Sequence, residues 1–99
     1  MADVAQNIYV GKDIHNEGRI VNVYDTYAHA LSHGATGLST IYDMTLADGT
    51  EGSAISQAAE TVGLTPDQNG FIHFWVAETT PIFLISNGMF GPPRRVVPA

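Results

Sequence analysis

Short runs of hydrophobic residues, alternating with polar ones or bounded by turn residues, recur along this chain. Such runs predict strands, because successive side chains of a strand point to opposite faces of a sheet. Residues 8–10 and 20–23 are β-prone and are separated by a polar segment with glycine at each end. They predict an N-terminal hairpin, preceded by a loose end over the first six residues. Residues 38–46 alternate apolar and polar positions up to Asp48-Gly49, which predicts a strand closed by a turn.

Two aromatic and β-branched runs, FIHFWVA over 71–77 and PIFLIS over 81–86, are separated by only three residues. They predict two adjacent strands of a central sheet, with a turn at Asn87-Gly88 after the second. We expect five side chains of these runs to dominate the core: Phe71, Phe74, Trp75, Phe83 and Leu84.

Two segments have the spacing of short helices. In DTYAHALSHG the apolar residues recur at helical intervals, with Asp25 as the N-cap and Gly34 as the stop. The alternative is one long strand over 20–31, because its apolar residues also fit one alternating face; the glycine favours the helix. The segment 53–62 carries an apolar stripe between Ser53 and Gly63, and it is the clearest helical pattern in the chain.

These elements predict an α+β fold, a small and mainly antiparallel sheet with one or two short helices packed on it. Ninety-nine residues suit one hydrophobic core, since typical domains have about 100–150 residues. We therefore expect a single globular domain over residues 1–91. Residues 92–99 begin with a Pro-Pro pair and predict an extended C-terminal arm.

Charged residues make up only 14% of the chain, compared with about 25% in an average soluble domain. A small domain has a large surface to cover, so either this surface is unusually rich in Ser, Thr, Asn, Gln and Gly, or part of it is buried against other copies or a partner, which is the interpretation we favour. Depletion of charge is typical of interface cores. A homo-oligomer is the partner prediction that follows.

The same composition excludes several classes of protein. A net charge of −6 disfavours nucleic acids and anionic membranes, and no apolar run approaches the roughly 20 residues that span a bilayer. The N-terminal residues lack the pattern of a secretory signal, so we expect a cytoplasmic protein, or one incorporated into a particle assembled there. The absence of cysteine excludes disulfides and thiolate metal ligands, and we expect no cofactor.

One candidate metal site lies on the helix predicted after residue 24. Asp25, His29 and His33 are spaced four residues apart, which places them on one ridge of a helix. Histidine pairs at this spacing chelate transition metals. The competing interpretation is an ordinary solvated helix face, because the apolar residues of the segment lie opposite.

A candidate ligand pocket would combine Tyr24, Tyr42, His73 and Trp75. Aromatic rings line many small-molecule sites, and a histidine between large apolar neighbours can act as an acid or base. The competing interpretation of His73 is a strand residue on the exposed face. The serines lack the Gly-x-Ser-x-Gly motif, so nothing local indicates a hydrolase.

The C-terminal arm is the third candidate site. Arg94 and Arg95 are two of only four basic residues, and Val96 and Val97 follow them directly. A stiff Pro-Pro segment loses little entropy on docking, and arginine pairs bidentately with carboxylates. These four residues are therefore predicted to contact a neighbouring subunit; the competing interpretation is a frayed tail.

In composition the chain is similar to small phage capsid-decoration and other assembly proteins, being poor in lysine, free of cysteine and rich in Gly, Ala and Thr. The likeness covers composition only and assigns no functional residue. The sequence predicts a non-catalytic structural or interaction protein that forms a symmetric homo-oligomer, such as a phage-type assembly or decoration protein of a virion. The alternative is a small-molecule-binding protein or enzyme with an aromatic and histidine pocket. A third hypothesis is an acidic decoy for a basic partner.

Overall fold

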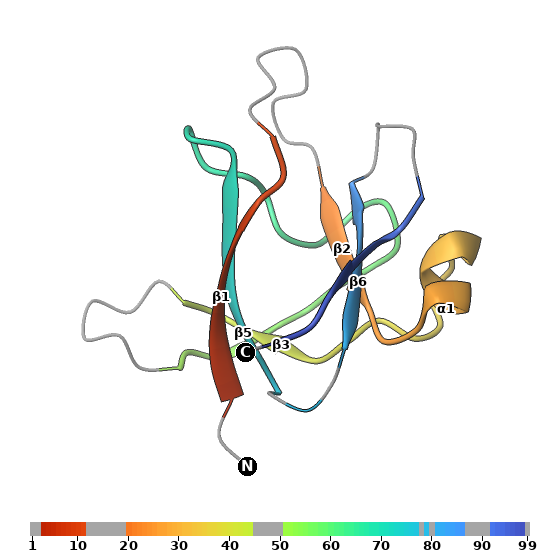
Figure 1. The fold of residues 1–99 in the computed structure, drawn as a ribbon, viewed down its shortest axis with the longest axis horizontal. Helices are drawn as coiled ribbons and strands as arrows, with labels where there is room; N and C mark the ends of the chain where they lie inside the picture. Colours follow the sequence, from red (N-terminus) through yellow and green to blue (C-terminus); the bar gives the residue numbers. More distant parts are fainter. Residues whose placement is uncertain are drawn as a thin grey trace.

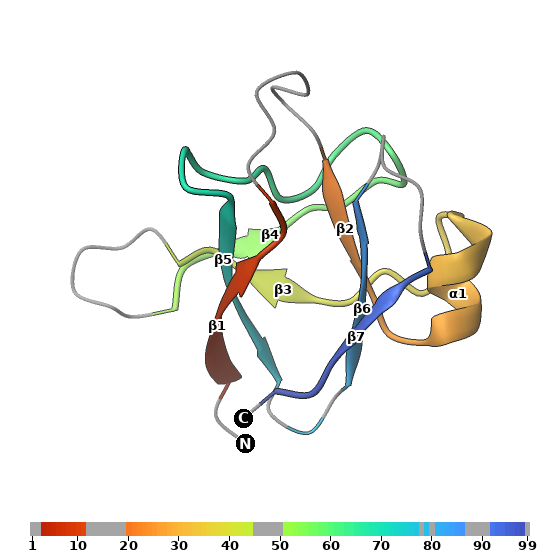
Figure 2. The ribbon, with the colours of Figure 1, turned by 45° about the horizontal axis from the view of Figure 1, so that its top comes forward.

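Two antiparallel sheets face each other, and one short helix lies outside the second sheet (Figures 1 and 2). This computed structural model describes residues 3–11, 20–44, 51–77, 79, 81–86 and 92–98 of the 99-residue chain. The first sheet has the strand order β1-β5-β3-β4, and the second has the order β2-β6-β7. The elements are β1 (Asp3–Tyr9), β2 (Val21–Tyr24), α1 (Tyr27–Ser32), β3 (Ile41–Tyr42), β4 (Ala54–Ile55), β5 (Phe71–Ala77), β6 (Ile82–Ser86) and β7 (Arg94–Val96).

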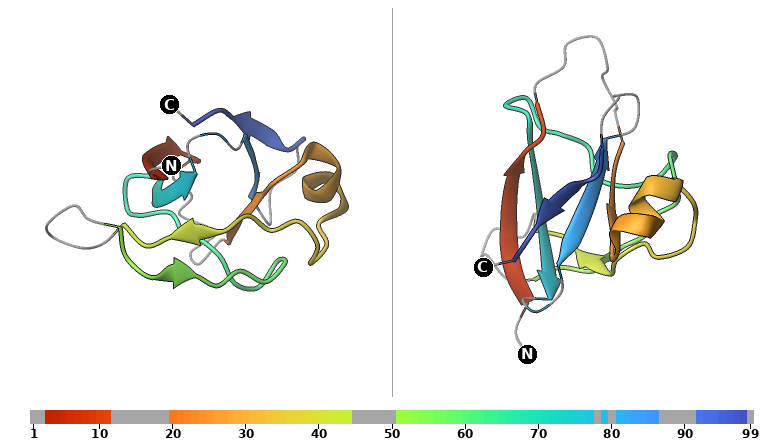
Figure 3. Two further views of the ribbon diagram at one scale, coloured as in Figure 1. Left: turned by 90° about the horizontal axis from the view of Figure 1, so that it is seen from below. Right: turned by 45° about the vertical axis from the view of Figure 1, so that its right-hand side comes forward.

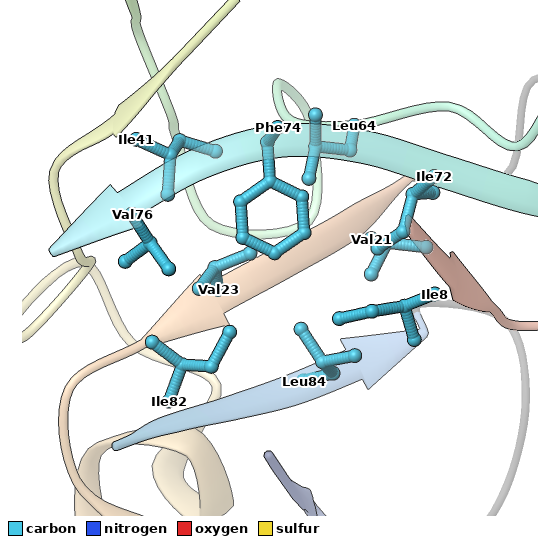
Figure 4. Packing of buried hydrophobic residues seen from close by; sticks show 10 residues of the cluster. All are labelled: Ile8, Val21, Val23, Ile41, Leu64, Ile72, Phe74, Val76, Ile82 and Leu84. Atoms are coloured by element: carbon cyan, nitrogen blue, oxygen red, sulfur yellow. The ribbon is translucent and has the colours of Figure 1, made fainter. Parts of the chain in front are cut away.

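The hydrophobic core lies between the two sheets, and Figure 4 shows its side chains converging on the ring of Phe74. Each fully buried aliphatic or aromatic side chain contributes about 1.5–3 kcal/mol through removal from water. Both sheets supply the cluster, so neither is stable without the other. Its buried members are Ile8, Val21, Val23, Ile41, Leu64, Ile72, Phe74, Val76, Ile82 and Leu84.

Strict alternation along β5 determines which residues reach this core. Ile72, Phe74 and Val76 are buried, whereas the residues between them face outward and are partly or fully exposed. β1 pairs antiparallel with β5 over its whole length, from Asp3 opposite Ala77 to Tyr9 opposite Phe71. Directly opposite residues lie on the same face of a sheet. The outward residues of both strands therefore form one surface.

The second sheet is buried on both sides at β2. Val21 and Val23 face the core, while Tyr24 packs on the outer side with Ala30 of α1 and Ile85 of β6. Helix α1 begins after the N-cap Thr26, whose hydroxyl accepts from the His29 backbone N–H, and ends where His33 adopts a left-handed conformation with φ 54°. One buried alanine thus fixes the helix to the sheet.

The predicted fold class is confirmed in its broad form: the protein consists mostly of antiparallel sheet with one short helix. The helix predicted after residue 24 is present, so the long strand over 20–31 is wrong. Its N-cap is Thr26, where Asp25 was expected, and its C-cap is His33, which places Gly34 at the predicted C′ position.

The helix predicted over 53–62 is wrong. β4 occupies its start, and residues 58–62 form a turn in which Ala58 and Val62 exchange backbone hydrogen bonds and Glu60 has φ 66°. A helix of ten residues is marginal in water, and a stripe rich in alanine buries little apolar surface. The buried side chain of Asn22 instead makes three hydrogen bonds with this turn, donating to the Ala58 and Val62 carbonyls and accepting from the Glu60 N–H, and these bonds outweigh helical propensity.

The strand pairings also differ from the sequence prediction. β1 pairs with β5 and β2 with β6, so the predicted N-terminal hairpin is wrong, and β1 already begins at Asp3, within the predicted loose end. β5 and β6 belong to different sheets, so they are not adjacent strands of one central sheet. Of the strand predicted over 38–46, residues 38–44 are described, and among them β3 spans Ile41–Tyr42. The Asp48-Gly49 and Asn87-Gly88 turns lie outside the described residues.

The expected core residues divide by face. Phe74 and Leu84 are buried, as predicted, but Phe71, Trp75 and Phe83 are only partly buried because they occupy the outward positions of β5 and β6. Residues 94–96 form β7, which pairs antiparallel with β6 of the same chain. This part of the C-terminal segment therefore contributes a strand to the second sheet.

Candidate functional site

The outward side of the first sheet carries a row of rings from three strands. Tyr9 lies opposite Phe71, and Trp75 lies opposite both Ala5 of β1 and Tyr42 of β3, so these side chains share one face. His73 stands between Phe71 and Trp75 in the β5 alternation. We call this surface the aromatic face. Its members are Tyr9, Tyr42, Phe71, His73 and Trp75.

Ring contacts order one half of the aromatic face. Tyr9 and Phe71 meet edge to face, with centroids 5.3 Å apart and an interplanar angle of 66°. Phe71 stacks on the His73 imidazole at 6.4 Å and 17°. Such aromatic pairs contribute about 0.5–1.5 kcal/mol beyond their buried area. Tyr9 nevertheless remains 53% exposed, which leaves a large ring available for contact with another molecule.

His73 uses both ring nitrogens within the protein. Its Nε2 lies 2.9 Å from Asp67 Oδ2 in the turn before β5, and its Nδ1 lies 2.5 Å from Asn7 Oδ1 on β1. Asp67 Oδ1 also accepts the backbone N–H groups of Asn69 and Phe71. Both ring nitrogens are thus hydrogen-bonded within the fold. His73 therefore fastens β1 and the turn to β5.

The hydrogen bond from His73, together with the backbone N–H of Phe71, lowers the pKa of Asp67 from its ordinary 3.8 to about 2. The charged carboxylate is favoured because every contact is a donor. Asp67 thus remains ionised over the whole physiological range and adds negative charge beside the aromatic face.

A pair of carboxyl groups lies at the other end of this face. Asp3 is on the outward side of β1, diagonal to Trp75. Its side chain is hydrogen-bonded to that of Glu51, which lies three residues before the start of β4. The hydrogen bond with Asp3 raises the pKa of Glu51, because it favours the protonated carboxyl; desolvation and the like charge of Asp3 act in the same direction with smaller effects. No cationic side chain of the described residues pairs with either carboxyl.

Trp75 and Tyr42 lie between this carboxyl pair and His73. Both are partly exposed, and they are direct neighbours across β3 and β5. The indole Nε1 of Trp75 is enclosed and makes no hydrogen bond with the described part of the chain. The indole is thus held as a flat hydrophobic platform, with its polar atom turned away from water.

The structure separates the predicted metal ligands. Asp25 Oδ1 lies 2.9 Å from His29 Nδ1, but α1 ends before His33, whose Nδ1 is 3.8 Å from Glu60 Oε1. The ridge expected from the spacing therefore does not continue beyond one turn. Over the described residues, no group of three or more histidine and carboxylate side chains is arranged to hold a metal ion.

The predicted ligand pocket is divided in the same way. Tyr42, His73 and Trp75 share the aromatic face, whereas Tyr24 is buried under α1, where its hydroxyl donates to the Gly34 carbonyl at 2.7 Å. Burial, with a smaller effect of Glu60, raises the pKa of Tyr24. Tyr24 is thus a packing residue. Sequence reasoning missed Tyr9, Asn7 and Asp67. The alternation of residues 3–9 was a usable signal for Asn7 and Tyr9 on one side of a strand, whereas Asp67 lies in the turn before β5.

The C-terminal residues divide between the two sides of the second sheet. Arg94 donates from Nη1 to the Tyr9 carbonyl at 2.5 Å and so bridges β7 to the edge of the first sheet. Arg95 lies opposite Phe83, on the outer side, where Phe83 meets Tyr27 of α1 edge to face at 6.0 Å. Val96 packs against the core, and Val97 is 60% exposed. Whether these residues contact a neighbouring subunit stays a prediction.

No protein-family model, curated protein or solved structure matches this chain. No helix in the described residues is long and apolar enough to cross a membrane. The groups available for function are therefore those of the aromatic face. The aromatic face offers stacking and carboxylate contacts, and its one histidine is fully engaged, so it is suited to binding.

Proposed function

We propose that this protein is a non-catalytic interaction protein that assembles with further copies of itself into a symmetric homo-oligomer. The observation that carries the proposal is the aromatic face, a row of rings on the outward side of a sheet in a small acidic chain. Interfaces are enriched in Tyr, Trp and Phe and depleted in Lys and Glu. The shortage of charged side chains, 14% of the chain, points in the same direction.

Further exposed apolar residues support assembly through more than one surface. Tyr27 and Leu31 lie one turn apart on the outer side of α1 and are 47% and 56% exposed. A subunit with an apolar surface on each of its two sheets can contact two neighbours. A structural subunit of a particle assembled in the cytoplasm, such as a virion decoration protein, would use such a pair of surfaces, and we include that role in the proposal.

Light scattering coupled to size exclusion tests the proposal over a range of protein concentrations. The wild-type chain is expected to have a mass several times that of the 10.6 kDa monomer. Replacement of the exposed Tyr9 by Ser should shift the population toward monomer, because aromatic residues supply much of the energy at interface centres. Replacement of the exposed Thr65 by Ser is the control. A monomer at every wild-type concentration would overturn the proposal.

One observation favours a second function, the binding of a small molecule beside Trp75. Its indole is a platform next to Tyr42 with a polar atom that no described residue satisfies. Trp75 is the only tryptophan, so its emission reports directly on this position. A change in emission with a saturating ligand, lost in Tyr42→Ala, would support this function; a screen of aromatic and cationic compounds with no such change would count against it.

A further inference from the structure

We infer that copies of this chain join head to tail, with Arg95 of one copy seated on the acidic patch of the next. The acidic patch is the part of the aromatic face formed by Asp3, Glu51, Tyr42 and Trp75. The inference rests on the proposed homo-oligomer and names the groups that make its contact. It commits to one occupant of the patch, a second copy of this chain.

The acidic patch combines two features that favour a cation. Asp3 and Glu51 are hydrogen-bonded to each other, and neither pairs with a basic side chain in the described residues. Trp75 and Tyr42 stand beside them on the same face. A guanidinium group binds the face of an indole or phenol ring and forms paired hydrogen bonds with carboxylates. One arginine side chain can therefore contact both carboxyl groups and both rings of the acidic patch.

Arg95 is the basic group that matches this patch. It is exposed, and it makes no hydrogen bond or ion pair with any residue that the structure describes. Its neighbour Arg94 differs, because it is tied to the Tyr9 carbonyl of its own chain. β7 holds Arg95 on a strand paired with β6, so little backbone freedom remains to be lost on docking.

The two groups face away from the core on different sheets. Ile82, Leu84 and Val96 face the core from the second sheet, so Arg95, which alternates with Val96, points away from it. The acidic patch faces away from the same core on the first sheet. Figure 3 shows β1 and β5 on one side of the molecule and β6 and α1 on the other, with β7 running from β6 across toward β1. Because the two groups lie on the outer faces of different sheets, the contact is one between two copies.

The placement of Arg95 and the acidic patch on different sheets determines the kind of assembly. In a two-fold dimer each copy uses one surface against the identical surface of its partner. Arg95 and the acidic patch lie on different sides, so two copies cannot exchange both contacts at once. A repeated heterologous contact gives a closed ring or a filament. The outer-face residues Phe83 and Tyr27, next to Arg95, would then lie against the rings of the neighbour's aromatic face.

Charge-swap variants of the full chain test the contact, with mass measured by analytical ultracentrifugation. The wild type should exceed the mass of a dimer. Arg95→Glu and Glu51→Arg should each raise the concentration needed for assembly about tenfold or more, equivalent to the loss of roughly 1.4 kcal/mol. An equimolar mixture of the two variants should assemble again, because each supplies the charge that the other requires. Circular dichroism confirms that each variant is folded.

Matched variants separate this contact from a general effect of charge. Glu51→Gln and Thr36→Lys each raise the net charge by one unit, but Thr36 is exposed and lies beside α1, away from the acidic patch. Only the first should weaken assembly. The emission of Trp75 should change on dilution in the wild type and not in Arg95→Glu, since Trp75 is the sole tryptophan.

The outcomes distinguish this inference from the proposed function. Assembly of the wild type that persists unchanged in Arg95→Glu would overturn the inference and leave the homo-oligomer standing. A wild-type dimer, or failure of the mixed variants to assemble, would also overturn it, as would binding of a basic peptide without any self-association. A wild-type monomer at all concentrations would overturn both.

Discussion

The side-chain amide of Gln57 bonds to both backbone polar groups of Val23. Its Oε1 accepts the Val23 N–H at 2.9 Å, and its Nε2 donates to the Val23 carbonyl at 3.2 Å and to the Ser39 carbonyl at 2.9 Å. A primary amide has the same donor and acceptor as a peptide group. The Gln57 side chain therefore makes the hydrogen bonds that a neighbouring strand would make along the free edge of β2. On the same edge, the backbone of Leu64 bonds to that of Val21.

Replacing Gln57 by Glu should lower the free energy of unfolding by about 1–3 kcal/mol. The carboxylate cannot donate, so the Ser39 carbonyl would lose its donor, and an unsatisfied polar group costs about 1–3 kcal/mol when buried, whereas the Val23 carbonyl would keep the Ser39 backbone N–H. Urea denaturation followed by circular dichroism measures the change. Gln68→Glu, in an exposed turn, is the matched control. Equal denaturation midpoints for the two variants would show that the amide does not support β2.

The strands were predictable from local pattern, but their partners were not. Runs of aromatic and β-branched residues identified β5 and β6. The pairing of β1 with β5 joins residues more than sixty positions apart, and no turn signal encodes it. The false helix over 53–62 shows the same limit: Asn22 and Gln57 stabilise an irregular path through contacts over 34 or more residues.

The candidate site was predictable in composition and not in arrangement. Tyr42, His73 and Trp75 were identified from residue type, and they do share one face. Tyr24 could not be distinguished from them, because its burial depends on α1 folding back over β2. The ridge of Asp25, His29 and His33 required a helix of at least nine residues, and the left-handed conformation of His33 ends α1 too early.

Asp67 should make stability depend on acidic pH. Its pKa is lowered from 3.8 to about 2, mainly by the bond with His73. The carboxyl group therefore stays ionised to a lower pH in the folded state than in the unfolded state. The resulting stabilisation is complete above the unfolded value of 3.8 and is lost as the pH falls toward 2. Thermal unfolding midpoints of the wild type should therefore decline across this window more steeply than those of Asp67→Asn. Parallel curves, or a carboxyl carbon resonance that titrates near 3.8, would contradict this.

Gly37 should not tolerate a side chain. Its φ is +83°, and an added Cβ would lie 2.0 Å from His29 Nδ1 and 2.7 Å from Asp25 Oδ1. Gly37→Ala is expected to cost about 1–2 kcal/mol from the left-handed backbone, with a further loss as the Asp25–His29 pair is displaced. In the double variant Gly37→Ala/His29→Ala, the backbone loss should remain, but the loss from displacing the His29 ring should be absent because the ring has been removed. Urea denaturation of both variants and of His29→Ala alone completes the cycle; strictly additive losses would mean that the ring does not contact Gly37.

Tyr24→Phe should destabilise the fold, although it removes a single oxygen. The Tyr24 hydroxyl donates to the Gly34 carbonyl at 2.7 Å, and the ring is 1% exposed, so water cannot replace the lost donor. We expect a loss of about 1–2 kcal/mol, the usual result of leaving one enclosed carbonyl without its partner. Tyr27→Phe is the control, since Tyr27 is 47% exposed and its edge-to-face contact with Phe83 needs only the ring. Hydrogen exchange should also quicken at His33 and Asp25, whose backbone N–H groups bond to Ala30 and Gly37 on either side of this link. A Tyr24→Phe chain as stable as Tyr27→Phe would mean that packing against Ala30 and Ile85 alone holds α1 on the second sheet.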